Sequence, residues 1–448
     1  MVRYWFSLVL AVVLCACSAP PEPAPEAAPG AAAPDATAEE GQDAMDAIAR
    51  DYLRLVLALG RHDDGYVDAY YGPAEWKAAV DAEAPPLETI AARSEALQQQ
   101  LAAVSVPAGG MESLRHAYLL RQLQALSARV AMLQGQVLSF DEESKALYDA
   151  VAPVQPERHF QAIVAQLEDA LPGEGSVAER YQAWRSGFVI PPERLDAVFR
   201  AAIDECRRRT AAHVALPEGE RFELEYVTDK PWSGYNWYQG NYHSLIQVNT
   251  DLPIFIDRAI DLACHEGYPG HHVYNMLLEK HLVDDRGWPE FSVYALYSPQ
   301  SLIAEGTANF GIEVAFPGDE RVAYEREVLF PLAGLDPATA GDYYRIQALV
   351  DGLGYAGNEA ARRYVDGAFS RGQAEDWLVR YALMEPARAA QRVRFIDTYR
   401  SYVINYNLGE DLVRRHVEAQ GGTTDAPERR WEVFGELLSS PRLPSGLQ

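Results

Sequence analysis

The middle of the chain carries the segment Asp261-Leu-Ala-Cys-His265-Glu266-Gly-Tyr-Pro269-Gly270-His271-His272. This segment holds three of the ten histidines of the protein within eight residues, next to a glutamate. Apolar residues at helical spacing precede it, which predicts that it begins inside a helix. Imidazole and carboxylate groups are ligands that zinc prefers, so this grouping has the composition of a metal site.

The spacing of the histidines predicts a break in that helix. In a regular helix His271 would be rotated by roughly 240° from His265, and His272 would lie about 10 Å further along the axis. Neither position allows two imidazole nitrogens to lie about 2 Å from one ion. Pro269 cannot donate a helical hydrogen bond, and Gly270 permits unusual dihedral angles. A bulge here would bring His271 to the ion, and we favour His271 over His272 as the ligand.

The remaining groups of a catalytic site can be assigned around this pair. Glu266 is placed to act as a general base, and His272 is expected to line the substrate pocket. Glu305 lies on an apolar downstream helix, where a carboxylate is costly unless it meets a cation, and is our third ligand. Glu279 and Glu313 are the alternatives for that position. Two further residues are expected to support the ligands, namely Asp261 and Asn309.

These motifs together resemble a known family. The sequence His265-Glu-Gly-Tyr-Pro-Gly-His-His272, followed by Glu305-Gly-Thr-Ala308, resembles the bacterial family called domain of unknown function 885, which is grouped with the zincin-type metallopeptidases. The resemblance implies Zn²⁺ bound by His265, His271 and Glu305, with Glu266 as the base. Thr307 departs from the tryptophan usual in that family.

Other candidate residues lie outside the motif. Tyr402 and Tyr406 are one helical turn apart and could donate to a developing oxyanion during peptide hydrolysis. His243, in a predicted strand with Asn249, could border an extended peptide paired with an exposed strand edge. A structural role for this histidine is an equal alternative. The lone histidines elsewhere are interpreted as structural.

Composition limits the partners of the chain. It has 448 residues, of which 48% are hydrophobic, so it can bury a large core. Acidic residues outnumber basic ones by 65 to 39, which gives a formal net charge of -26. Nucleic acid and anionic lipid surfaces are therefore excluded as expected partners.

The N-terminus indicates export. Residues 1–16 resemble a lipoprotein signal peptide, and the sequence Leu14-Cys-Ala-Cys17 resembles a bacterial lipobox with Cys17 as the lipidated residue. An ordinary secretory signal is the alternative. Residues 17–42 are rich in Pro and Ala and are expected to form a disordered tether. The expected location is the cell envelope, on the periplasmic face of the outer membrane, with the protein anchored by lipid.

The rest of the chain is expected to be mainly α. Helical periodicity dominates residues 43–216, and a catalytic region, residues 217–448, is expected to continue from it as one unit. Strand patterns at 222–227 and 243–249 predict a small antiparallel sheet next to the active-site helix. The family resemblance implies that the fold is zincin-like. Cys206 and Cys264 lie in apolar helical patterns and are expected to be buried free thiols.

These observations predict a zinc-dependent peptidase that hydrolyses oligopeptides in the cell envelope, with a peptide as its substrate. Two alternatives stay open. One is a zinc amidase that acts on cell-wall peptides, which the predicted location favours. The other is a noncatalytic binding or assembly lipoprotein that keeps the metal for stability, against which the presence of Glu266 argues.

Overall fold

The computed structural model describes residues 36–230 and 232–447. The signal peptide, Cys17 and most of the expected tether lie outside the described residues. The first helix begins at Ala36, so the last seven residues assigned to the tether belong to it instead. None of the helices in the described ranges is long and apolar enough to cross a membrane.

The first half of the described chain is helical, as its periodicity predicts. Its helices are α1 (Ala36–Leu59), α2 (Ala74–Glu83), α3 (Leu87–Ala103), α4 (Gly110–Leu133), α5 (Phe140–Tyr148), α6 (Glu157–Ala170), α7 (Val177–Arg185) and α8 (Leu195–Ala211). Two of these helices, α5 and α7, begin with a serine whose hydroxyl oxygen accepts from the third residue of the helix, while the glutamate there returns the bond. These caps fix where the helices begin.

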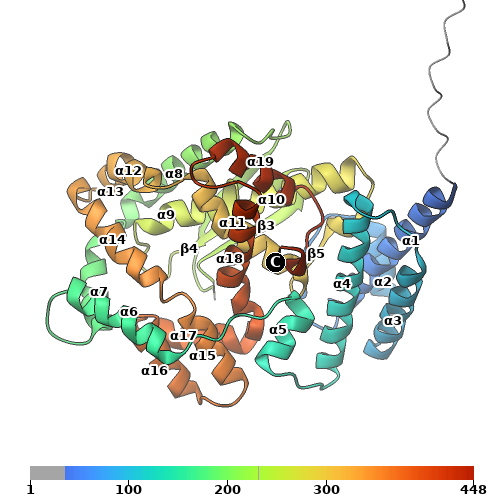
Figure 1. Cartoon of the computed structure of the whole chain (residues 1–448), viewed down its shortest axis with the longest axis horizontal. Coiled ribbons are helices and arrows are strands. Elements are labelled where there is room, and N and C mark those ends of the chain that lie inside the picture. The colour runs from blue at the N-terminus through green and yellow to red at the C-terminus, as the bar shows by residue number, and fades with distance from the viewer. Residues whose placement is uncertain (1–35, 231, 448) are drawn as a thin grey trace, which may run out of the picture.

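The second half adds the helices around the histidine motif. They are α9 (Asp257–Leu262), α10 (His271–Leu278), α11 (Pro299–Ala315), α12 (Glu320–Tyr324), α13 (Phe330–Ala333), α14 (Ala340–Asp351), α15 (Ala356–Val365), α16 (Arg371–Tyr381), α17 (Pro386–Tyr399), α18 (Ile404–Ala419) and α19 (Pro427–Leu438). Helices α1 to α4 lie at one end of the molecule and α6, α7 and α16 at the other, with α11 and α18 between them (Figure 1). The mainly α fold class is confirmed.

The expected sheet is present, with one strand more than the sequence suggested. It contains β2 (Arg221–Val227), β3 (Gly234–Gly240) and β4 (His243–Asn249), in the order β2-β4-β3. The β3–β4 pair is antiparallel, whereas β2 pairs with β4 in parallel. The two predicted strands run in the same direction because the Gly- and Tyr-rich segment between them is itself a strand. A second, two-stranded antiparallel sheet joins β1 (Val67–Tyr70) to β5 (Val293–Ala295).

One large core connects both halves of the chain, and a second cluster of buried residues lies among α6, α7 and α14 to α17. The buried side chains of the large core run from Met45 in α1 to Leu447 at the end of the described residues. At its centre α11 and α18 touch backbone to backbone, since a Cβ added to Gly306 would lie 2.4 Å from the main chain of Gly409. Glycine at both positions therefore allows the close approach that brings Glu305 next to Tyr402.

The prediction of two free thiols is wrong. Cys206 in α8 and Cys264 form a disulfide, with their Cα atoms 5.7 Å apart. The two cysteines are separated by 58 residues, on segments that the sequence alone does not place side by side. The bridge ties α8 to the residue that precedes His265.

Candidate metal centre

The helix that carries His265 breaks where the sequence predicts. Helix α9 ends at Leu262, a π-helical turn covers Ala263–Gly267, and α10 begins at His271. Pro269 follows a cis peptide bond in the gap. Gly270 is required there, because an added Cβ would lie 1.9 Å from the carbonyl oxygen of His265. The break turns the chain so that both predicted histidine ligands face the same point.

Three donor atoms from two segments converge at this point. Nε2 of His265 lies 3.1 Å from Nε2 of His271 and 3.3 Å from Oε2 of Glu305. Nε2 of His271 lies 3.7 Å from the same carboxylate oxygen. The ligand atoms of all three residues lie within 4.8 Å of one another, a spacing suited to one shared cation. The structure thus brings together the three residues that the sequence nominated as ligands.

Asn309 orients the first imidazole. Its Oδ1 lies 2.8 Å from Nδ1 of His265, and its Nδ2 donates to the carbonyl oxygen of Tyr406 at 3.2 Å. The second bond fixes the amide so that its oxygen faces the histidine. His265 must therefore carry its proton on Nδ1, which leaves the lone pair of Nε2 directed at the cluster. The supporting role predicted for Asn309 fits this contact.

The surroundings of the Glu305 carboxylate show whether a cation fits between the three ligands. Its Oε1 accepts a hydrogen bond from the hydroxyl of Tyr402 at 2.8 Å. Its Oε2 is buried and has no hydrogen-bond partner among the described residues, although two imidazoles lie beside it. A buried carboxylate oxygen without a partner is costly, and a cation there would remove the cost. The donor set of two imidazoles and one carboxylate is one that zinc accepts.

The cluster perturbs the ionisation of its own members. Burial opposes the charged form of Glu305, yet the adjacent imidazoles of His265 and His271 hold its pKa below the ordinary range. Burial would lower the pKa of His271, but Glu305 and the nearby carboxylates of Glu266 and Asp68 raise it to about 9. The site is therefore a strongly negative pocket that favours a positive charge at its centre.

Glu266 borders the cluster from the π-helical turn. Its side chain is 6% exposed, and its Oε1 lies 3.1 Å from where a Cβ on Gly234 would stand. The main-chain carbonyl of Glu266 accepts from Nδ2 of Asn236 at 2.7 Å. Strand β3 therefore holds this residue in place, and glycine at position 234 leaves room for its carboxylate.

Asp68 is a third acidic group at the cluster, and sequence reasoning missed it. It lies on β1 and accepts a hydrogen bond from the hydroxyl of Tyr235. Burial raises the pKa of Asp68 to about 6, and the negative charge of Asp68 helps to raise the pKa of His271. The only available signal was one aspartate in a short strand almost two hundred residues before His265, which no spacing rule connects to the motif.

The position of His272 corrects our expectation that it lines the substrate pocket. Its side chain is 0% exposed. Ser244 Oγ lies 2.8 Å from its Nδ1, and Glu220 Oε2 lies 3.2 Å from its Nε2. Glu220 also accepts from Tyr268 and Arg207. With both ring nitrogens satisfied inside the protein, this histidine has no face for a substrate.

His243 also departs from its predicted role. It begins β4, which is the central strand of its sheet, so the exposed edge expected beside it is already paired on both sides. Its Nε2 lies 3.6 Å from Glu223, and the side chain is largely covered. Asn249 donates to the carbonyl oxygens of Lys230 and Trp232. The structural alternative for His243 therefore replaces the substrate-binding one.

The other acidic candidates are occupied elsewhere. Asp261 binds Arg321 at 2.8 Å and Arg258 at 3.1 Å, so it does not hold an imidazole as expected. Glu279 accepts from the hydroxyl of Tyr238 and the main chain of Asn241. The other alternative for the third ligand, Glu313, pairs with Arg414. The partners Arg321, Tyr238 and Arg414 are far from these residues in the sequence, so the sequence alone did not indicate them.

The two predicted tyrosines flank the cluster on α18 and the turn before it. Tyr402 contacts Glu305 directly, and burial with the nearby carboxylate holds its pKa well above the ordinary value. The ring centroid of Tyr406 lies 5.9 Å from that of Tyr402. Burial and the same carboxylate also raise the pKa of Tyr406, and its hydroxyl makes no hydrogen bond with any described residue. Both hydroxyls therefore stay protonated near neutral pH.

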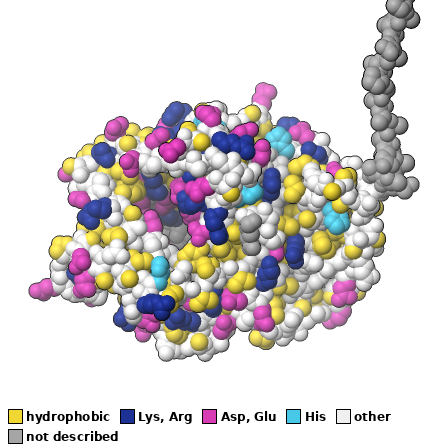
Figure 2. Space-filling view, in the orientation of Figure 1, with side chains coloured by type: hydrophobic (Ala, Val, Ile, Leu, Met, Phe, Trp, Pro, Cys, Tyr) yellow, Lys and Arg dark blue, Asp and Glu magenta, His cyan; other side chains and the backbone are white. Residues whose placement is uncertain are grey.

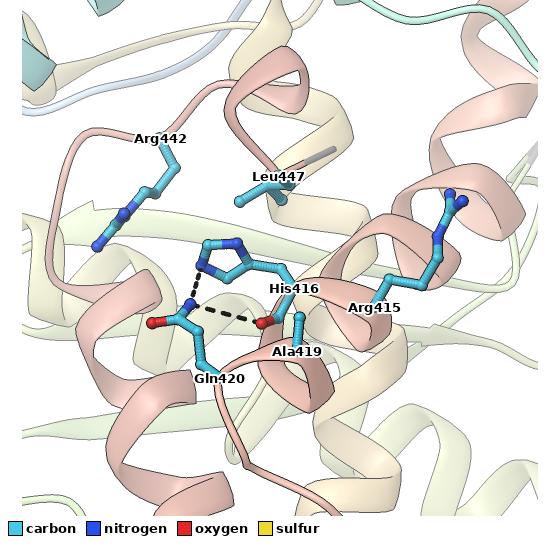
Figure 3. A pocket seen from close by; sticks show the side chains of 6 residues that line it. All are labelled: Arg415, His416, Ala419, Gln420, Arg442 and Leu447. Carbon is cyan, nitrogen blue, oxygen red and sulfur yellow. Dashed lines mark hydrogen bonds between the residues drawn. The ribbon is translucent and has the colours of Figure 1, made fainter.

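Two concavities lie outside this cluster. One, of about 430 Å³, is lined by Arg415, His416, Ala419, Gln420, Arg442 and Leu447. Figure 3 shows that the imidazole of His416 bonds to Gln420 while the two arginines stand on either side. The other, of about 60 Å³, lies between α9 and α17. In Figure 2 the hollow near these elements contains both acidic and basic side chains.

Comparisons with known proteins support the fold only. No family model matches the chain, and no curated protein matches it. A solved structure described as "the putative lipoprotein from Colwellia psychrerythraea" is similar, with a TM-score of 0.50 and 15% identity over 81% of this chain and 68% of that one. A second, described as "The Structure of CHT", has a TM-score of 0.37 and 10% identity over 89% and 91% of the two chains.

Proposed function

We propose that this protein is a zinc-dependent peptidase that hydrolyses oligopeptides. The observation that carries the proposal is the buried, unpartnered Oε2 of Glu305 beside Nε2 of His265 and Nε2 of His271. A structural zinc site normally closes its coordination with four protein ligands, whereas a catalytic site keeps three and an open position. Within the described residues the donor set has three members.

The three ligands would hold the ion, and Glu266 and the tyrosines would perform the remaining steps. Bound zinc would supply Lewis acidity to water and to the peptide carbonyl. Glu266 would take a proton from the attacking water and give it to the leaving amine. Tyr406, whose hydroxyl is not committed to another described residue, would donate to the developing oxyanion, while Tyr402 would hold Glu305 in position.

We also propose that the protein is a lipoprotein of the cell envelope. The lipobox-like sequence ending at Cys17 supports this, and so does the similar solved structure, whose description names a lipoprotein. The membership of the family called domain of unknown function 885, and the position on the periplasmic face of the outer membrane, belong to the same proposal. Labelling with a fatty-acid probe, lost in Cys17→Ala, would test the anchor.

The decisive experiment for the activity is Glu266→Gln. Loss of the general base should lower kcat about 10²- to 10⁴-fold while zinc content, measured by mass spectrometry of the metal, stays at one ion per chain. Glu193→Gln is the matched control and should retain activity, because this glutamate is exposed and lies just before the start of α8. Peptide hydrolysis by Glu266→Gln at the rate of the unmodified protein would end the proposal and favour a noncatalytic metal lipoprotein.

A further inference from the structure

A small cavity next to the cluster is lined by arginines. It lies between α9 and α17 and has a volume of about 60 Å³. Its polar lining consists of Arg185, Arg258, Arg388, Ser233, Asn249 and Gln391. This volume leaves room for a small polar group such as a carboxylate.

The positive charge of this cavity is not fully compensated. Arg185 pairs with Asp257 at 3.1 Å and Arg258 pairs with Asp261 at 3.1 Å. Arg388 has no carboxylate within ion-pair distance among the described residues. Burial lowers its pKa, and the neighbouring charges of Arg185 and Arg258 lower it further, against the opposite effect of Glu385 and Asp257. Such a concentration of arginine contrasts with a chain whose net charge is -26.

A second observation shows that a hydrogen-bond acceptor is missing. Nε of Arg185 is buried and makes no hydrogen bond to any described residue, although its Nη2 binds Asp257. An unsatisfied buried donor costs free energy that an incoming acceptor would recover. Arg392, one turn after Arg388 on α17, likewise has no carboxylate partner in the described part of the chain. Two guanidinium groups of the cavity wall, those of Arg185 and Arg388, therefore have capacity for an anion, and Arg392 lies one turn away.

Two lines of contact connect the cavity to the metal cluster. Ser233 in the cavity wall precedes Gly234, whose added Cβ would meet both Leu262 of the wall, at 2.7 Å, and Oε1 of Glu266, at 3.1 Å. On the other side, Arg392 follows the lining residue Gln391, and its guanidinium carbon lies 5.9 Å from the ring of Tyr406. An extended peptide held at the cluster can therefore reach the cavity within a few residues, each spanning about 3.3 Å.

We infer that this arginine cavity binds a carboxylate of the peptide substrate. The inference rests on the proposed peptidase function and adds a substrate class to it. The planar guanidinium fork matches a carboxylate in two parallel hydrogen bonds, and the size of the cavity fits that group. If the carboxylate is the C-terminal one, the bond cleaved lies a few residues before the end of the substrate. The amine that receives the proton from Glu266 then belongs to the released C-terminal fragment.

The test compares peptides that differ only in one carboxylate. Three N-acetylated peptides without other acidic groups are used, one with a free C-terminus, one amidated, and one amidated with a glutamate at the last position. Binding is measured by fluorescence anisotropy to the Glu266→Gln protein, which keeps its ligands but does not turn over. We expect the free acid, or the glutamate peptide, to bind about 10- to 100-fold more tightly than the plain amide.

Substitutions at Arg388 assign the effect to the cavity. In Glu266→Gln/Arg388→Gln the carboxylate peptide and the plain amide should bind about equally tightly. Arg388→Lys in the same background should restore part of the preference, since lysine keeps the positive charge but lacks the forked guanidinium group. Arg394→Gln, at an exposed arginine of the same helix, is the matched control and should keep the full preference. Equal binding of all three peptides, or equal losses in Arg388→Gln and Arg394→Gln, would overturn the inference.

The outcome also separates this inference from the proposed function. If the unmodified protein cleaves free and amidated peptides equally well and Glu266→Gln cleaves neither, the peptidase stands and the cavity assignment fails. If carboxylate-dependent binding is found but no peptide is cleaved by the zinc-loaded protein, the cavity binds its ligand and the peptidase proposal fails.

Discussion

His271 and His272 are consecutive residues at the start of α10, yet their surroundings are opposite. His271 faces a cluster of donor atoms in which a carboxylate oxygen has no partner. His272 points the other way, where Ser244 and Glu220 satisfy both of its nitrogens and no part of it is exposed. The contrast teaches how to sort the histidines of such a motif. A histidine with a ring nitrogen that is free of protein partners can be a metal donor, and one with both nitrogens bonded inside the protein is structural. Four experiments can test this division.

The largest difference is expected from removing each imidazole. His271→Ala should lower the affinity for zinc on the order of 10³-fold, because one of three ligands is lost. His272→Ala should keep zinc affinity within a few-fold, because its ring faces away from the cluster. Competition with a zinc chelator measures both. A loss of zinc in His272→Ala as large as that in His271→Ala would show that the division is wrong.

Stability should show the reverse order. His272→Gln leaves buried groups on Ser244 and Glu220 with poorer partners and should lower the free energy of unfolding by about 2 to 3 kcal/mol. In zinc-free protein above about pH 9, where His271 is neutral, His271→Gln should lower it by less, because no ion pair with Glu305 is then lost. Urea denaturation of both variants without metal checks this. Equal destabilisation would remove the distinction between a donor and a structural histidine.

A smaller effect is expected from the residue that orients His265. Asn309→Ala removes the acceptor for Nδ1–H of His265 and should weaken zinc binding about 10- to 100-fold. Asn309→Asp keeps an acceptor oxygen and should bind zinc more tightly than Asn309→Ala. Chelator competition on the two variants gives the comparison. Identical affinities would mean that the hydrogen bond does not set the orientation of the ring.

The smallest effect concerns the pH dependence of stability. Burial lowers the pKa of His272, and hydrogen bonds from His272, Tyr268 and Arg207 lower that of Glu220 to about 2 against the effect of burial. Each group therefore releases its proton more readily in the native state than in the unfolded chain. The stabilisation is complete above pH 6.5 for His272 and above pH 4.5 for Glu220, and is lost as the pH falls.

Urea denaturation from pH 7.5 to pH 5 measures the part due to His272. The unmodified protein should lose stability over this range, and His272→Gln should lose less. His281→Gln, at an exposed histidine, serves as the control and should follow the unmodified protein. A steeper decline in His272→Gln than in the unmodified protein would contradict the assignment.

The sequence predicted most of the helices and the composition of the cluster. Helices at 87–103 and 157–170 end where their apolar periodicity ends, because each buries one face against a hydrophobic core. His265, His271 and Glu305 could be nominated because a break at Pro269 is a local property of the chain. Such local signals, in spacing and backbone chemistry, can be read without knowing the tertiary structure.

The remaining features depended on contacts between distant segments. The roles of His272 and Asp261 were wrong because their partners, Glu220 and Arg321, come from segments that no spacing rule brings near them. Strand β3 was missed because glycine, asparagine and aromatic residues gave it the composition of a turn. Asp68 and Arg388 were missed because a single charged residue in an ordinary strand or helix carries no sign of its tertiary neighbours.

The disulfide between Cys206 and Cys264 links the first histidine donor to the oxidation state of its surroundings. Cys264 is the residue immediately before His265, so the covalent bond holds the π-helical turn against α8. Such bonds persist where thiols are not kept reduced, as outside the cytosol. Protein produced in a reducing cytosol would therefore carry its donor segment without that covalent support, and recombinant material intended for metal measurements should be secreted or oxidised before it is assayed.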